Sequence, residues 1–181
     1  RELQWDLRRA GQVALHLLQA ITDMQARDRI AQAMVAAVRR IQPLAEVLRI
    51  QAIHHDVTDD NVVSRPDEAG RLIPDGVIDF GDILNGWLAA DLAVTCSALL
   101  HHADGNPFFI LPAIRAYHAV NPLNAAEARA LWPLIVARAC ILVASSEQQL
   151  AVEPDNDYVL GNIEHERTIF EVAISVQSVV M

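Results

Sequence analysis

Apolar residues recur at helical spacing along most of this 181-residue chain, and the pattern changes between about residues 50 and 87. Such spacing gives each helix an apolar stripe that must be buried against other elements. Hydrophobic residues make up 52% of the chain, which is enough for a sizeable core. The changed segment holds β-branched residues, turn residues and clustered acids. We therefore expect one domain, residues 1–181, that is mostly α with a small β-hairpin.

Capping residues mark the ends of two predicted helices. Asp23 is placed to cap a helix from Met24 to about Ile41. Asn124, followed by an acid at Glu127, matches an N-cap with its N3 partner and predicts a helix to about Leu150. Other helices are expected in the first 50 residues, from Leu88 to about His102, over 107–119 and from Gly161 to about Val179, and Pro133 is expected to kink its helix.

The segment between the helices predicts a hairpin. Its strands are expected at about Val62–Val63 and Gly76–Phe80, because both runs are short and rich in β-branched residues. The residues between them include Pro, Gly and Asp, which favour turns.

The charge of the chain excludes several functions. Net charge is −9, and all 14 basic residues are Arg. A broad basic surface for nucleic acid is excluded, and docking on an anionic membrane is disfavoured. Without Lys, this chain cannot supply a Walker A lysine, a Schiff base or the strand lysine of a kinase.

Cysteine usage and hydropathy favour a cytoplasmic protein. Cys96 and Cys140 each lie in an apolar stretch and are expected to be free and buried. The richest apolar run, Leu131–Ala144, is broken by Pro133 and Arg138, so no membrane span is predicted. A first residue other than Met led us to expect a piece of a longer protein.

The predicted hairpin gathers polar residues with a chemically useful spacing. His54 and Asp56 precede it, Asn61 lies at the entry to its first strand, and Asp79 lies in the second. A carboxamide and a carboxylate offer oxygen ligands, which suit Mg²⁺. A second carboxylate that does not bind the metal could accept a proton from an attacking hydroxyl.

These residues resemble a known family. HHDVTDDN has the catalytic-loop form HxDxxxxN, and VIDFGD, with its Asp 18 residues past the Asn, resembles a DFG-like metal-binding element. Together they resemble the aminoglycoside phosphotransferase and choline kinase family, more narrowly its hydroxylysine kinase and homoserine kinase-like members. The resemblance implies the C-terminal lobe of a protein-kinase-like (α+β) fold, with the N-terminal nucleotide lobe absent.

The resemblance assigns roles residue by residue. Asp56 corresponds to the catalytic aspartate, Asn61 to the asparagine ligand of Mg²⁺, and Asp79 to the aspartate that joins Mg²⁺ to the nucleotide phosphates. His54 matches the histidine that holds the loop in shape. His55 departs from the glycine common at its position.

Two further acids also match family positions. Asp91 matches a recurring aspartate in the helix after the loop, which we interpret as structural. Asp82 follows the DFG-like element, and its role stays open.

The implied activity is transfer of the γ-phosphoryl of ATP or GTP, with Mg²⁺, to a hydroxyl of an amino alcohol or hydroxyamino acid. The partner would be a small hydroxylated amine, and the missing N-terminal lobe would be needed for efficient transfer. Bacterial relatives can be fused to a class III aminotransferase, and pyridoxal phosphate would belong only to such a fused domain.

Other interpretations remain open at this point. A non-catalytic binding or scaffolding module, which could bury its apolar surface in a homodimer, would also use a high apolar share. A zinc hydrolase is disfavoured, because His54–His55 and His101–His102 lack finger spacing. Asp59 and Asp60 are expected to be solvated, with contact to a cationic substrate as the alternative. His165, Glu166 and Arg167 near the last helix are expected at the surface, with a substrate contact as the alternative.

Overall fold

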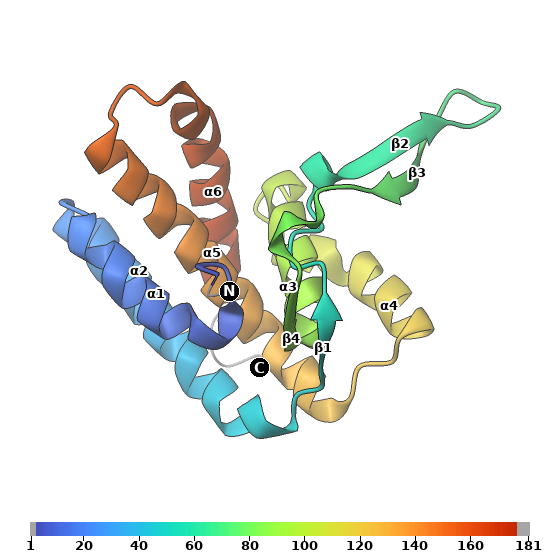
Figure 1. Cartoon of the computed structure of the whole chain (residues 1–181), viewed down its shortest axis with the longest axis horizontal. Helices are drawn as coiled ribbons and strands as arrows, with labels where there is room; N and C mark the ends of the chain where they lie inside the picture. The colour runs from blue at the N-terminus through green and yellow to red at the C-terminus, as the bar shows by residue number, and fades with distance from the viewer. Residues whose placement is uncertain (1–2, 177–181) are drawn as a thin grey trace.

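The computed structural model describes residues 3–176 and shows a helical bundle joined to a small β region (Figure 1). The helices are α1 (Ala10–Leu17), α2 (Met24–Ile41), α3 (Leu88–Leu99), α4 (Leu111–Val120), α5 (Ala125–Val152) and α6 (Asp157–Ser175). The strands are β1 (Ile50–Ile53), β2 (Val62–Pro66), β3 (Leu72–Val77) and β4 (Leu84–Trp87). Short 3-10 turns cover Leu7–Arg9, Leu18–Ala20, Gln42–Val47, Asp59–Asn61, Phe80–Asp82, Leu100–His102 and Pro107–Ile110. The expected class, mostly α with a small β element, is confirmed.

Helix α5 is the centre of the fold, and α1, α2, α3 and α6 all pack against it. Its side chains Leu134, Ile135 and Ile141 have no exposed surface. In the part of the chain that the structure describes, α5 is long and apolar enough to cross a membrane. However, 72% of its most apolar window is buried inside the protein. We therefore identify α5 as the core helix of the bundle.

The predicted caps form as expected. The Asp23 carboxylate accepts hydrogen bonds from the backbone N–H groups of Gln25 and Ala26 at the start of α2. Asn124 and Glu127 form a reciprocal capping box at the start of α5. Each satisfies backbone donors that the first turn of a helix leaves free.

Helix α5 continues through Pro133 as one helix, and the expected kink there stays a prediction. One helix boundary needs adjustment. Helix α6 begins at Asp157 rather than at Gly161, because the side chain of Asn156 accepts a hydrogen bond from Val159 N–H and starts the helix earlier. The predicted end at Val179 lies outside the described residues.

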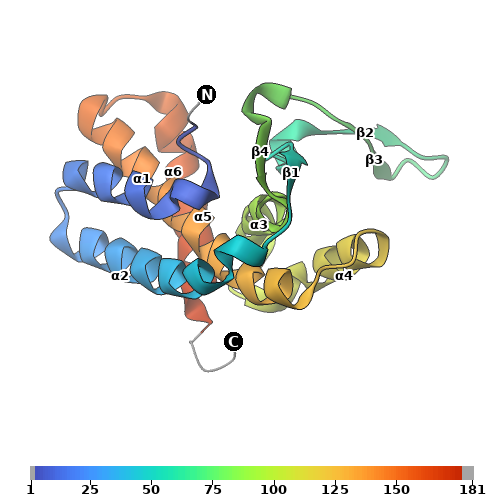
Figure 2. The ribbon, with the colours of Figure 1, turned by 60° about the horizontal axis from the view of Figure 1, so that its bottom comes forward.

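The hairpin extends further than predicted at its turn end and less far at its base. β2 and β3 pair antiparallel, with Val62 opposite Val77 and Pro66 opposite Leu72. Part of the expected turn is therefore strand. The prediction that the second strand reaches Phe80 is wrong, because Asp79 adopts a left-handed conformation with φ 57° that ends the extended chain. The hairpin projects away from the helices (Figure 2).

A second pair of strands was not predicted. β1 and β4 pair antiparallel, with Ile50 opposite Trp87 and Ile53 opposite Leu84. These segments are far apart in the sequence, so no turn residues join them directly. Their pairing closes the β region and places the chain after Ile53 beside the start of α3.

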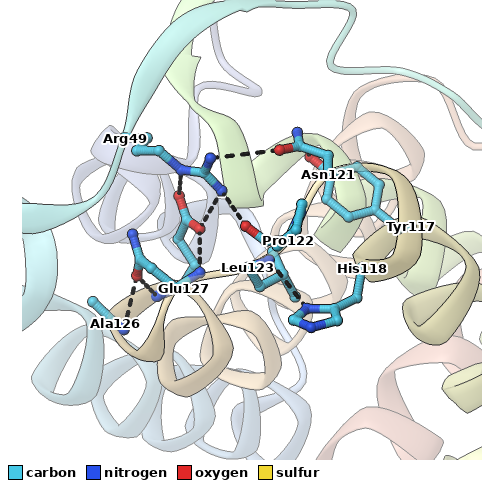
Figure 3. Close-up of polar contacts among 9 residues, drawn as sticks. Arg49, Tyr117, His118, Asn121, Pro122, Leu123, Ala126 and Glu127 are labelled. Carbon is cyan, nitrogen blue, oxygen red and sulfur yellow. Dashed lines mark hydrogen bonds and ion pairs between the residues drawn. The ribbon is translucent and has the colours of Figure 1, made fainter.

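Arg49 fixes the point where the chain enters this β region (Figure 3). Its Nε and Nη2 each donate to a different carboxylate oxygen of Glu127 at 2.6 Å, and Nη2 also donates to the carbonyl of Pro122 at 2.9 Å. The Glu127 side chain is fully buried. Burial opposes its charge, but the hydrogen bonds from Arg49 and from Asn124 N–H outweigh that effect and hold the pKa of Glu127 below its ordinary value.

Because this pKa is lowered in the folded protein, the stabilisation by the Glu127 carboxylate is complete above the ordinary glutamate pKa and is lost as the pH falls through the folded value. Glu127→Gln should lower the free energy of unfolding at pH 7 by about 1–3 kcal/mol. It should also weaken the acid dependence of stability. Urea unfolding from pH 3 to 7 measures both effects.

The matched control is Glu171→Gln, which removes an exposed ion pair with Arg29. Exposed pairs contribute less than about 1 kcal/mol. Equal losses for the two variants, or an unchanged acid dependence in Glu127→Gln, would contradict this account.

Candidate active site

The loop between β1 and β2 is anchored on α3. The carboxylate of Asp91 accepts a hydrogen bond from His55 N–H at 2.6 Å, and the hydroxyl of Thr95 donates to the carbonyl of Val57 at 2.8 Å. Asp91 and Thr95 are four residues apart, so they lie on one face of the helix. The structural role expected for Asp91 is confirmed by this contact.

His55 makes the sharp change of direction that brings Asp56 out of the strand. It has φ 67°, in the left-handed region that favours glycine. Its ring is buried and its Nε2 lies 2.7 Å from the carbonyl oxygen of Trp5. Burial lowers the pKa of His55, so the neutral ring fits this position. The contacts of the side chain offset the strain of a non-glycine residue there.

His54 links this loop to the end of β3. Its Nδ1 accepts from Asp56 N–H at 3.3 Å, and its Nε2 lies 2.9 Å from the carbonyl oxygen of Ile78. Because Nδ1 is an acceptor, the hydrogen belongs on Nε2, which donates to Ile78. The ring also meets the edge of Phe80. These contacts agree with the loop-holding role expected of His54.

Asp56 is held through both carboxylate oxygens. Asn61 Nδ2 donates to Oδ2 and to the main-chain carbonyl of Asp56, both at 2.8 Å. Arg138 Nη2 donates to Oδ1 at 3.2 Å. The Asp56 side chain keeps 28% of its surface exposed, so a ligand can still reach it.

Asn61 and Asp79 meet at the base of the hairpin. The main-chain carbonyl of Asn61 accepts a hydrogen bond from Ile78 N–H at 2.9 Å. Asp79 is the residue after Ile78, so it lies beside Asn61. The Asp79 carboxylate accepts from Gly81 N–H at 3.1 Å and is exposed. Since the Asn61 amide nitrogen faces Asp56, its oxygen is left for another partner.

These groups share one pocket of about 540 Å³. The loop carrying Asp56 and Asn61 forms one wall with Asp79, and α5 and α6 form the other. Six carboxylates and one arginine line it. The pocket therefore attracts cations, whether a metal ion or an ammonium group.

The donor set fits Mg²⁺. Among residues 3–176, no group of three or more His, Cys, Asp or Glu side chains is arranged to hold a metal. Asn61 and Asp79 offer one amide oxygen and one carboxylate, which is sufficient for an ion that keeps several waters and binds substrate phosphates.

Two pocket residues were missed or misjudged from the sequence. Arg138 was noted only as a break in an apolar run, yet its side chain is buried and stacks on Trp5, with 4.5 Å from guanidinium carbon to ring centroid. Glu166 was expected at the surface, with a substrate contact as the alternative; it is partly buried and lines the pocket, and burial raises its pKa. The signal for Arg138 was a charge inside an otherwise apolar helix.

The other expectations divide as follows. Asp59, Asp60, His165 and Arg167 are exposed as expected, and Asp59 lies 3.1 Å from His102 Nε2. Cys96 and Cys140 are free and buried, and burial raises the pKa of each thiol to about 12.

The chain belongs to the phosphotransferase enzyme family, whose model matches residues 1–132. It is therefore the C-terminal helical lobe of a kinase-like fold. The matched range contains the loop, the hairpin and α3, but it ends before Arg138 and Glu166.

Two curated relatives are kinases. The chain is 25% identical to a hydroxylysine kinase of Danio rerio over 121 residues, which are 67% of this chain and 34% of that protein. It is 31% identical to a homoserine kinase of Pseudomonas aeruginosa (strain UCBPP-PA14) over 144 residues, which are 78% of this chain and 42% of that protein. The chain thus spans well under half of each. No solved structure matches.

The anchoring of the loop on α3 can be tested with Asp91→Ala. Loss of the carboxylate leaves His55 N–H without its charged acceptor, so we expect a loss of about 1–3 kcal/mol in the free energy of unfolding. The His55 amide should also exchange faster with deuterium. Asp28→Ala, at an exposed position of α2, is the control. Unchanged exchange at His55 would remove the anchoring role.

Proposed function

We propose that this chain is the catalytic lobe of a small-molecule kinase. It would direct the γ-phosphoryl of ATP or GTP onto a hydroxyl of an amino alcohol or hydroxyamino acid. The main observation behind the proposal is that hydrogen bonds from Asn61 and Arg138 orient the Asp56 carboxylate. This carboxylate stays accessible on a pocket wall that also contains Asn61 and Asp79. Family membership and the two kinase relatives support it.

Asp56 is the proposed proton acceptor. The hydroxyl oxygen of the acceptor forms a bond to phosphorus while the bond from phosphorus to the nucleoside diphosphate breaks, and the hydroxyl proton passes to Asp56. Contacts from Asn61 and Arg138 restrict rotation of the carboxylate. The acceptor hydroxyl is therefore presented with a base that is already oriented.

Asn61 and Asp79 are the proposed metal ligands. A bound Mg²⁺ would neutralise charge that develops on the phosphate oxygens. Asn61 has two functions in this proposal, since its amide nitrogen orients Asp56 while its oxygen faces the metal. The hydrogen bond from Ile78 N–H to the Asn61 carbonyl keeps both ligands in register.

Exposed apolar residues support a second lobe in the longer protein. Ile78, Phe80 and Ile83 follow the hairpin beside the site and keep 48%, 59% and 50% of their surface exposed. Covering them would exclude water from the site. The chain has no Lys to bind the phosphates, so we propose that this second lobe supplies that charge and that the chain transfers phosphate inefficiently alone.

The acceptor class follows from the relatives and the pocket charge. Hydroxylysine and homoserine both carry an ammonium group and a hydroxyl, and an acidic pocket suits an ammonium group. A cytoplasmic location, a homodimer and a fused aminotransferase stay predictions of the sequence.

Asp56→Asn, made in the longer protein, tests the base. Without a proton acceptor, turnover should fall by about 10²–10⁴-fold, while binding of Mg-nucleotide is nearly unchanged. Steady-state kinetics and calorimetry measure the two effects. The control is Asp104→Asn, at an exposed position outside the pocket. Turnover equal to that of the control would remove the assignment of Asp56.

Asp79→Ala tests the metal site. Loss of the carboxylate should weaken Mg²⁺-dependent nucleotide binding by at least about tenfold, since one charge-assisted contact is worth about 1.5–3 kcal/mol. Asp75→Ala is the control, because Asp75 lies on the same hairpin in an exposed ion pair with Arg65. Affinity equal to the control would contradict the ligand role. Absence of any Mg-nucleotide binding in the unmodified protein would favour a scaffolding module.

A further inference from the structure

Two groups of opposite charge, the buried Arg138 and the partly buried Glu166, line the pocket without pairing with each other. Arg138 from α5 is 5% exposed, and only its Nη2 has a hydrogen-bond partner, the carboxylate of Asp56. Its Nε and Nη1 are buried and have no partner among the described residues. Buried N–H groups of a charged side chain cost free energy unless they are bonded.

Glu166 from α6 has a carboxylate oxygen, Oε2, that is buried and lacks a hydrogen-bond donor among the described residues. Its carboxylate interacts with the side chain of Ser146. Arg138 and Glu166 interact electrostatically but do not form an ion pair within 4.0 Å. The pocket therefore contains one cationic and one anionic group with unpartnered polar atoms among the described residues, and a ligand could form hydrogen bonds with both.

We propose that Arg138 and Glu166 form a subsite for the charged end of an α-amino acid, in which Arg138 binds the carboxylate and Glu166 binds the ammonium group. This inference rests on the proposed function and narrows its acceptor to a hydroxylated α-amino acid rather than an amino alcohol. The ammonium group of an amino alcohol would pair with Glu166, but the alcohol has no carboxylate to pair with Arg138. An α-amino acid is a zwitterion and can pair with both.

The position of Arg138 suits this role. Its Nη2 reaches Asp56, so an amino acid held on the guanidinium has its side-chain hydroxyl close to the proposed base. Trp5 lies over one face of the guanidinium, so the unpartnered donors Nε and Nη1 at its edge are the groups that would bind a carboxylate, and edge-on contact is the geometry that Arg–carboxylate pairs prefer. Burial raises the pKa of Glu166, and a bound ammonium group would favour its ionised form.

The test measures binding to the 181-residue chain by calorimetry. The probes are L-homoserine, 3-amino-1-propanol, which lacks its carboxylate, and 4-hydroxybutanoate, which lacks its amino group. A second pair is 5-hydroxy-L-lysine and its decarboxylated form, 1,5-diamino-2-pentanol. We expect at least one of the two amino acids to bind, and to bind about 10–100-fold more tightly than its analogues, as one charge-assisted contact predicts.

Variants assign the two ends of the ligand. Arg138→Gln should abolish the preference for the amino acid over its decarboxylated analogue and leave the affinity for that analogue unchanged. Glu166→Gln should abolish the preference for homoserine over 4-hydroxybutanoate. The controls are Arg129→Gln and Glu164→Gln, which lie at exposed positions of the same two helices. If thermal unfolding shows that Arg138→Gln does not fold, Glu166→Gln and the wild-type comparison still decide.

Three outcomes would overturn the subsite. These are no binding of either amino acid, equal binding of the decarboxylated analogues, or equal loss of all ligands in Arg138→Gln, which indicates that Arg138 acts only on Asp56. Failure of the kinase proposal is distinguishable. If the amino acid binds but the longer protein transfers no phosphoryl group, the subsite proposal stands and the kinase proposal fails. If the longer protein phosphorylates amino alcohols as readily as amino acids, the kinase proposal stands and the subsite proposal fails.

Discussion

The ion pair between Arg138 and Asp56 joins the core of this protein to the loop of its candidate active site. The middle of helix α5, residues 130–144, is apolar and largely buried, and Arg138 is the one charge within it. Such a charge needs an anionic partner, and Asp56 provides one at 3.2 Å. The loop is held on its other side by Asp91 of α3. The position of the proposed base thus depends on two helices that also build the core.

This arrangement explains how a largely helical lobe can present an oriented carboxylate on a short loop. His55 provides the change of direction, and its left-handed backbone is tolerated because its amide and its ring both have partners. Asn61 then couples the proposed base to the proposed metal site, since its side chain contacts Asp56 and its main-chain carbonyl contacts Ile78. The loop as a whole is thus positioned by α3 and α5, which are distant from it in the sequence.

The sequence predicted the features that depend on local chemistry. Asp23 and Asn124 cap their helices as expected, because an N-cap needs only its own first turn. The motif around Asp56 and Asn61 was recognisable because its spacing lies within one loop. The pairing of β1 with β4 was missed, since it joins segments more than 30 residues apart with no turn between them.

The part of the site contributed by α5 was also missed, and the part from α6 was only an alternative, for a related reason. Nothing near Arg138 in the sequence shows that its guanidinium meets Asp56, 82 residues away. Glu166 has polar neighbours and an ordinary helical pattern, so its partial burial depends on how α6 packs on α5. Long-range packing determines both the Arg138–Asp56 contact and the burial of Glu166. The spacing of apolar residues in the sequence predicts helices and strands but does not show how they pack.

The central claim is that this lobe directs phosphoryl transfer to a hydroxyl oxygen. The most direct measurement is a phosphotransfer assay on the longer protein, with Mg-ATP and Mg-GTP against hydroxylated amines and amino acids, and with the product identified by ³¹P NMR. The account predicts a new phosphate monoester on the hydroxyl of one acceptor, formed only with Mg²⁺. Nucleotide that stays intact with every acceptor, or is cleaved to inorganic phosphate alone, would contradict it.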